Sequence, residues 1–162
     1  MNQRRRQVLW RARCVERRTA GSASGLRKRA HGQPENRASG RLSEIPGGCV
    51  EADESPYQAA IRECREELGL DLTPGRMLVV DWVPARAGRT EGLMVLFDGG
   101  TLGRRVHERI VVPPGELKGW AFSDPPEAAQ RLPPLLTRRI TEALHARADG
   151  CSYYLEDGVR VT

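Results

Sequence analysis

Three glutamates, Glu63, Glu66 and Glu67, stand at positions i, i+3 and i+4 of a segment with helical spacing. On a helix this spacing places the carboxylates on one side, where like charges repel by about a few tenths of a kcal/mol per exposed pair. A divalent cation between them removes the repulsion. Oxygen ligands without His or Cys favour magnesium, with manganese as the alternative, and magnesium shares its shell with substrate phosphates. The cluster therefore predicts a phosphate-bearing substrate.

The competing interpretation is a solvated helix face, because glutamates are common on protein surfaces. Arg62 and Arg65 lie beside the acids and could steady them by ion pairing, whereas a single surface arginine contributes little. Helical spacing alone does not decide between a metal site and a solvated face.

The longer spacing pattern around these acids decides between the two interpretations. Gly48 is followed by five residues and Glu54, then by seven residues and Arg62-Glu63-Cys64-Arg65-Glu66-Glu67-Leu68-Gly69-Leu70. This pattern resembles the signature of the Nudix (MutT-related) hydrolases, G-x5-E-x7-R-E-U-x-E-E-x-G-U, where U is aliphatic. All seven fixed positions agree, and Cys64 occupies a U position as a small hydrophobe. Chance agreement is on the order of one in 10^7 per register.

The resemblance implies roles for the matching residues. It makes three carboxylates the metal ligands, namely Glu63, Glu66 and Glu67. Gly48 would offer a backbone carbonyl to the metal, and Glu54 and Arg62 would brace the loop and the helix. Glu54 joins the metal shell in some members of the family. Arg62 and the three carboxylates together form the expected catalytic set.

The resemblance also implies an acid anhydride hydrolase that uses magnesium. Its substrate would be a nucleoside diphosphate linked to another moiety, such as a nucleotide sugar, ADP-ribose, a dinucleotide, an NTP or a 5′-triphosphorylated RNA. In such an enzyme a metal-bound water would attack one phosphorus in line, and a carboxylate would have to accept its proton. Glu67 is the expected base. Glu116 and Glu91, outside the motif, are alternatives, although each is also readily explained as an exposed loop glutamate.

A second function class is a catalytically weak Nudix-fold binding or regulatory module that holds nucleic acid with a basic N-terminal arm. The intact acids favour the hydrolase, since a binding module has no need to keep three mutually repelling carboxylates. No short motif beyond the signature identifies the substrate.

A helix must carry the three acids. Ser55 is a suitable N-cap, Pro56 fits the first helical position, and Gln58 completes a capping box. Leu68-Gly69 predicts the C-terminal end. Apolar residues at helical spacing predict the buried face, namely Tyr57, Ile61, Cys64 and Leu68. Ahead of this helix we expect a short strand over Leu42–Ile45 that ends in a Pro46-Gly47-Gly48 turn.

The residues after the motif predict the scaffold. Strands are expected over Met77–Val83, Gly92–Phe97, Arg104–Val112, Lys118–Phe122 and Tyr153–Leu155, the first two forming a hairpin. A second helix should start at Pro133-Pro134 and end at Gly150, burying Leu136, Ile140, Ala143 and Leu144. This order fits an α/β fold with a mixed sheet and helices on both faces, and the resemblance implies an α/β/α sandwich.

Charge divides the chain. Residues 1–41 contain twelve Lys or Arg and two Glu, a net charge of +10, and the other residues carry −5. We predict a basic, disordered extension over 1–41 and a Nudix domain over 42–162. The extension is interpreted first as a solvated tail; a nucleic-acid arm, a transit peptide and a misassigned start are the alternatives.

The family normally has a strand directly ahead of the Pro-Gly-Gly turn. This chain offers only Gln7–Cys14, nearly thirty residues too early. If that strand were absent from the sheet, an exposed edge would favour aggregation or a homodimer and make the chain marginally stable.

The remaining features limit the class of protein. No run of about 18 apolar residues occurs, so we expect a cytoplasmic protein without a membrane segment. The four cysteines form no C-x-x-C pair and are expected to be reduced structural thiols, and the histidines form no cluster. Four aromatic residues could stack on a nucleobase, although core positions are more common for strand aromatics, namely Trp82, Trp120, Tyr153 and Tyr154.

Overall fold

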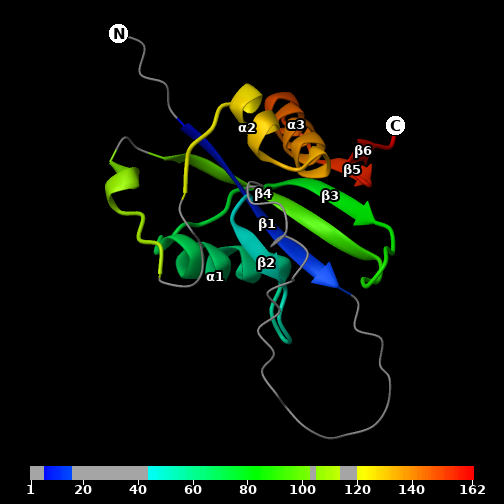
Figure 1. The fold of residues 1–162 in the computed structure, drawn as a ribbon, viewed down its shortest axis with the longest axis horizontal. Coiled ribbons are helices and arrows are strands. Elements are labelled where there is room, and N and C mark those ends of the chain that lie inside the picture. The colour runs from blue at the N-terminus through cyan, green and yellow to red at the C-terminus, as the bar shows by residue number, and fades with distance from the viewer. Residues whose placement is uncertain (1–5, 16–43, 103–104, 114–119) are drawn as a thin grey trace, which may run out of the picture.

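The structure, a computed structural model, describes residues 6–15, 44–102, 105–113 and 120–162, and of residues 6–15 and His107 it describes the backbone only. A six-stranded sheet lies between one helix on one face and two on the other (Figure 1). In sheet order the strands are β2 (Gly47–Cys49), β1 (Arg6–Val15), β4 (Gly92–Leu102), β3 (Met77–Val83), β5 (Tyr153–Glu156) and β6 (Val159–Arg160). The helices are α1 (Pro56–Leu68), α2 (Pro125–Arg131), α3 (Pro134–Asp149) and the 3-10 turn η2 (Val106–Glu108).

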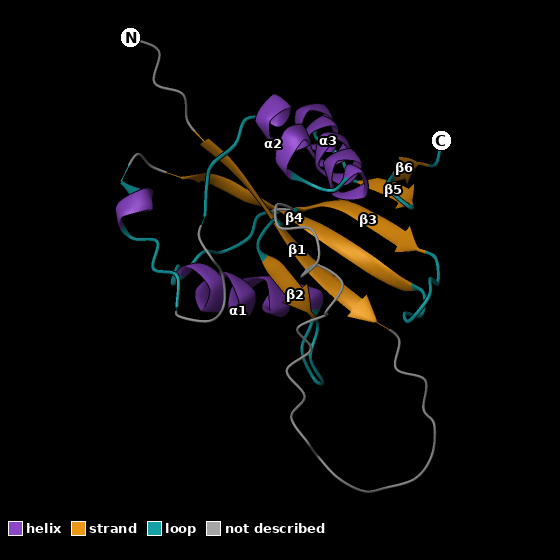
Figure 2. Ribbon diagram, in the orientation of Figure 1, coloured by secondary structure: helices purple, strands orange, loops and turns teal. Residues whose placement is uncertain are grey.

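The sheet is mixed, as predicted. β1 pairs with β2 and β3 pairs with β5 in parallel, whereas the other neighbouring pairs are antiparallel (Figure 2). Each face has its own apolar core, one beneath α1 and the other beneath α3. The predicted α/β sandwich with helices on both faces is therefore confirmed.

Strand β1 lies inside the sheet, between β2 and β4. Ala12 stands opposite Gly48 on one side and opposite Val95 on the other. The strand expected over Gln7–Cys14 is thus a member of the sheet, so the edge that its absence would expose is covered. Residues 6–15 belong to the folded domain rather than to an extension. The expectations for residues 16–41 lie outside the described residues.

The strand next to the site is β2, and its position corrects the predicted one. Glu44 and Ile45 are not in a strand, and the pairing with β1 instead takes Gly47–Cys49, whose first two residues belong to the predicted turn. Pairing with a neighbouring strand overrides the local preference of glycine. Gly47 has φ of 135°, a conformation that glycine adopts readily.

Helix α1 has the predicted bounds and caps. Ser55 and Gln58 form the capping box, and Gly69 ends the helix at φ of 65° while its N–H donates to the Arg65 carbonyl. The buried face differs in part from the prediction: it comprises Ala59, Ala60, Cys64 and Leu68. Tyr57 is partly exposed and packs edge-on against Phe97.

Several downstream predictions are confirmed. β3 has the predicted bounds, the hairpin with β4 is present, and β5 covers the predicted Tyr153–Leu155. Helix α3 begins at Pro134 and ends at Gly150, with Leu136, Ile140 and Ala143 buried.

Two strand predictions are wrong where the chain is described. Residues 105–113 contain η2 and no strand, because the Val111 N–H donates to the Leu68 carbonyl at the end of α1 instead of to a strand. Residues 120–122 are also not in a strand, and the rest of the Lys118–Phe122 prediction lies outside the described residues. Helix α2, which Asp124 caps, was not predicted.

A buried ion pair ties the sheet to α3. Asp81 on β3 is fully buried, contacts Arg139 of α3, and accepts a hydrogen bond from the Gly158 N–H at 2.9 Å. Asp81 therefore faces α3, which fixes the direction of its neighbours on β3.

The exposed aromatics correct another expectation. Trp82, Trp120 and Tyr154 are each more than a third exposed, so they are not core residues, whereas Tyr153 packs against the core beneath α3.

Within the described part of the chain, no helix is both long and apolar enough to span a bilayer. Three cysteines with described side chains are free, Cys64 being buried and Cys49 and Cys151 exposed.

Candidate active site

The candidate site forms where α1 crosses the end of β2. A Cβ added to Gly48 would lie 2.1 Å from Oε1 of Glu63 and 2.5 Å from its Cδ. Distances below 3 Å do not occur between such atoms, so a β-carbon at this position would force the end of the Glu63 side chain to move. The Glu63 carboxylate thus occupies the space that a β-carbon at position 48 would take.

The second contact between β2 and α1 involves Glu67. The Gly47 N–H donates to Oε2 of Glu67 at 3.0 Å. The conformation of the glycine pair thus orients one carboxylate and makes room for another. The sequence pattern identified Gly48, but nothing in it pointed to the Gly47 N–H.

Arg62 holds the acids together. Its Nε and Nη2 donate to the two carboxylate oxygens of Glu54 at 2.8 and 3.0 Å, and its Nη1 donates to Glu63 and Glu66, both at 2.9 Å. Nη2 also donates to the Cys49 carbonyl at 3.0 Å. A guanidinium has five N–H donors, and these five bonds use all of them. Arg62 therefore joins the loop, β2 and the helix in a way that a lysine could not reproduce.

The surroundings shift the pKa values of two of the carboxyl groups in opposite directions. The hydrogen bond from Arg62 lowers the pKa of Glu54, and the same contact raises the pKa of Arg62 itself. Burial raises the pKa of Glu63 and outweighs the opposite effect of Arg62. The Glu66 side chain is 53% exposed and that of Glu63 only 15%, so Glu63 is the desolvated acid of the pair.

The donor set fits a hard divalent cation. Three carboxylates contact one guanidinium, which leaves an excess of negative charge, and Glu54, Glu63, Glu66 and Glu67 offer oxygen donors without a competing His or Cys. As they stand, the described residues contain no group of three acidic, His or Cys side chains gathered around one point, because Arg62 lies between Glu63 and Glu66. Binding an ion would exchange those Arg62 contacts for metal contacts.

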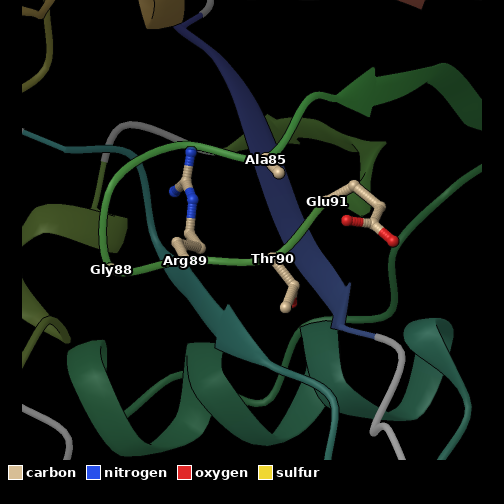
Figure 3. Close-up of a pocket in the computed structure, with 5 residues that line it drawn as sticks. All are labelled: Ala85, Gly88, Arg89, Thr90 and Glu91. Carbon is tan, nitrogen blue, oxygen red and sulfur yellow. The ribbon is translucent and has the colours of Figure 1, made fainter.

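Of the two loop glutamates that are alternative candidates for the base, the structure describes only one. Glu91 is exposed and lines a cavity of about 360 Å³ in the β3–β4 loop together with Ala85, Gly88, Arg89 and Thr90 (Figure 3). It stands on the β3–β4 loop, whereas the acids stand on α1. Glu116 lies outside the described residues.

Comparison with known proteins supplies the family. No curated protein matches the sequence. Among solved structures, the solution structure of the E. coli ORF135 protein is similar, with 24% sequence identity and a TM-score of 0.49 over 88% of this chain and 94% of that one. The NUDIX domain family matches residues 13–144, most of the chain, including β1 from Arg13 onward and the whole candidate site. The chain therefore belongs to the Nudix family, a family of pyrophosphohydrolase type.

Proposed function

We propose that this chain is a magnesium-dependent pyrophosphohydrolase, manganese being the alternative metal, that cleaves a nucleoside diphosphate linked to another moiety. The observation that carries the proposal is the approach of Glu63 to Gly48. A carboxylate stands where any other residue would place a β-carbon, and an arginine with all five donors engaged holds it there. Surface glutamates on a solvated helix face need neither feature.

The residues that would hold the metal are Glu63, Glu66 and Glu67, with the Gly48 carbonyl beside them. With an ion bound, the site would gain neutralisation of the diphosphate oxygens and a water of lowered pKa. Arg62 would keep the carboxylates in place, and Glu54 would keep Arg62 oriented through its two hydrogen bonds.

Glu67 is the proposed general base. Its contact with the Gly47 N–H fixes the carboxylate at the end of β2, so that one oxygen is positioned by the backbone. Glu66 is the more exposed acid, and Glu63 is the more desolvated one. Glu91 and Glu116 remain the alternatives for this role.

The test is a substrate panel with magnesium and with manganese. The panel comprises nucleotide sugars, ADP-ribose, dinucleotides, NTPs and 5′-triphosphorylated RNA. Turnover of at least one is expected, and Glu67→Gln should lower its kcat by about 100-fold or more, as loss of a general base does. The amide keeps an oxygen for the Gly47 N–H, so the geometry should survive.

Glu127→Gln is the matched control, because Glu127 is an exposed glutamate on α2, on the other face of the sheet from α1, and glutamine can keep its place in the capping box. It should leave kcat unchanged. Turnover that survives Glu67→Gln unchanged would refute the assignment of Glu67, and the variants Glu91→Gln and Glu116→Gln would then identify the base. No turnover on any substrate would favour a binding or regulatory module.

A further inference from the structure

The sheet face that carries α1 is only partly covered by it. On β4, Val95 and Phe97 lie in the core beneath α1. Leu93 precedes Val95 by two residues on the same strand and so points to the same face. Its exposed fraction is 40%. Helix α1 packs on β1, β2 and β4. Leu93 and the strands beyond β4 extend past the part of the sheet that the helix covers.

Two aromatic residues continue this uncovered face. Trp82 stands directly opposite Leu93. Asp81 faces α3, so Trp82, its neighbour on β3, faces the α1 side. On β5, Leu155 lies in the core beneath α3, so Tyr154 also faces the α1 side. Trp82 is 38% and Tyr154 47% exposed. We call Leu93, Trp82 and Tyr154 the open sheet surface.

This surface is continuous with the candidate site. Gly48 pairs with Ala12, Ala12 with Val95, Val95 with Val80, and Val80 with Tyr154. One row of the sheet therefore runs from the glycine beside the acids to the open sheet surface. β3 is three strands from β2, which at the usual spacing is about 14 Å. A nucleoside diphosphate has a length of this order.

The charge of the open sheet surface indicates which part of a nucleotide it would bind. Its members, Leu93, Trp82 and Tyr154, are apolar or aromatic and include no Lys or Arg, so it offers no positive charge to a phosphate. Glu156, which stands opposite Trp82 on β5, and the Tyr154 hydroxyl add hydrogen-bonding groups at the rim. An apolar surface with a polar rim suits a neutral, planar ring that carries N–H and carbonyl groups at its edge.

Resting on the proposed function, we propose that the open sheet surface binds the nucleobase of the substrate, with Trp82 as the stacking residue, while the acids of α1 hold the pyrophosphate. A stacking residue tolerates several bases, because every base has a flat face. Any preference for one base over another would then come from the polar groups at the rim.

Binding of products tests this without any hydrolysis. Nucleoside monophosphates contain no pyrophosphate bond, so their affinities can be measured by calorimetry with the intact chain and magnesium. Trp82→Ala should weaken their binding about ten-fold, within the range that loss of one base–aromatic stack causes. Trp82→Phe should keep most of the affinity, and ribose 5-phosphate, which lacks a base, should bind the wild type and Trp82→Ala equally.

Met77→Ala is the matched control, since Met77 begins the same strand with the same exposed fraction of 38%. It should leave nucleotide affinity unchanged. Melting curves and sedimentation of each variant establish that it is folded and in which oligomeric state.

Four results would overturn the proposal. The first is equal nucleotide affinity of the wild type and Trp82→Ala, and the second is a loss of ribose 5-phosphate affinity in Trp82→Ala as large as its loss of nucleotide affinity. The third is a loss of nucleotide affinity in Trp120→Ala but not in Trp82→Ala. The fourth is a dimer that the Trp82→Ala substitution dissociates without changing nucleotide affinity. Failure is separable from failure of the proposed function. If Trp82→Ala hydrolyses a nucleotide with the same KM as the wild type, only the proposed base site is wrong. If nucleotide binding depends on Trp82 but no substrate is turned over, only the proposed hydrolase activity is wrong.

Discussion

At the scale of single residues, the site depends on one missing side chain and one fully engaged guanidinium. Gly48 matters for the space it leaves, and Arg62 for the five hydrogen bonds it donates. The family signature predicted which residues gather here. It could not predict the Gly47 N–H and the Cys49 carbonyl as partners, since both are backbone groups whose positions depend on how β2 pairs with β1.

The steric role of Gly48 gives the first prediction. Gly48→Ala should destabilise the fold by about 1–3 kcal/mol, the usual cost of overpacking. In a Glu63→Ala background the same substitution should cost much less, because the carboxylate that blocks the β-carbon is gone. Urea unfolding of the four proteins in this double-mutant cycle measures the coupling. Equal costs in the two backgrounds would mean that Glu63 does not occupy this space.

Glu54 gives a prediction for pH. Arg62 lowers the folded-state pKa of Glu54 below its ordinary value of 4.5, so the ionised carboxylate stabilises the fold. This contribution is complete above the unfolded pKa and disappears as pH falls through the folded pKa. Glu54→Gln should therefore lower the melting temperature at pH 7, and the difference from wild type should shrink below about pH 4.5. Glu156→Gln is the control, and a difference independent of pH would contradict the assignment.

At the scale of elements, local signals explain what was predictable. The N-cap, the helical proline and the terminal glycine act within a few residues, and they fixed both ends of α1 and the C-terminal end of α3. β2 and residues 105–113 were predicted wrongly, because their hydrogen bonds go to distant partners: β1 for the former and the end of α1 for Val111. Apolar residues alone do not show which partner an extended segment has.

The capping box of α1 can be tested directly. Ser55→Ala removes the acceptor of the Gln58 N–H and should lower the free energy of unfolding by about 1 kcal/mol. Because α1 carries the acids, activity at temperatures near the midpoint should fall with it. Thr141→Ala, inside α3, serves as the control and should be neutral or slightly stabilising, since alanine is the better helix former. A Ser55→Ala protein as stable as wild type would show that the box contributes nothing.

At the scale of the whole molecule, the principal finding is that the sheet is completed by a strand from the basic N-terminal region. β1 pairs on both sides, so it joins β2, next to the site, to the rest of the sheet. The overall sandwich was predictable from the order of elements. The membership of β1 was not, because its pairing with β2 crosses some thirty residues of sequence and leaves no local signal.

Truncation tests the place of β1. A chain that begins at residue 6 should keep the cooperative melt of the full chain, whereas one that begins at residue 16 should lose it, because β2 and β4 would no longer be connected through the sheet. Circular dichroism against temperature measures both. An equally cooperative melt after removal of residues 1–15 would show that β1 is dispensable.

The central claim is that the acids of α1 cleave a pyrophosphate bond. Its most direct test is hydrolysis of the best panel substrate in oxygen-18 water with magnesium, followed by mass spectrometry of the products. We predict one labelled oxygen on a phosphate group of one product, formed by the wild type and by Glu127→Gln but reduced about 100-fold or more in Glu67→Gln. Equal labelling by the wild type and Glu67→Gln, or none with any substrate, would contradict the account.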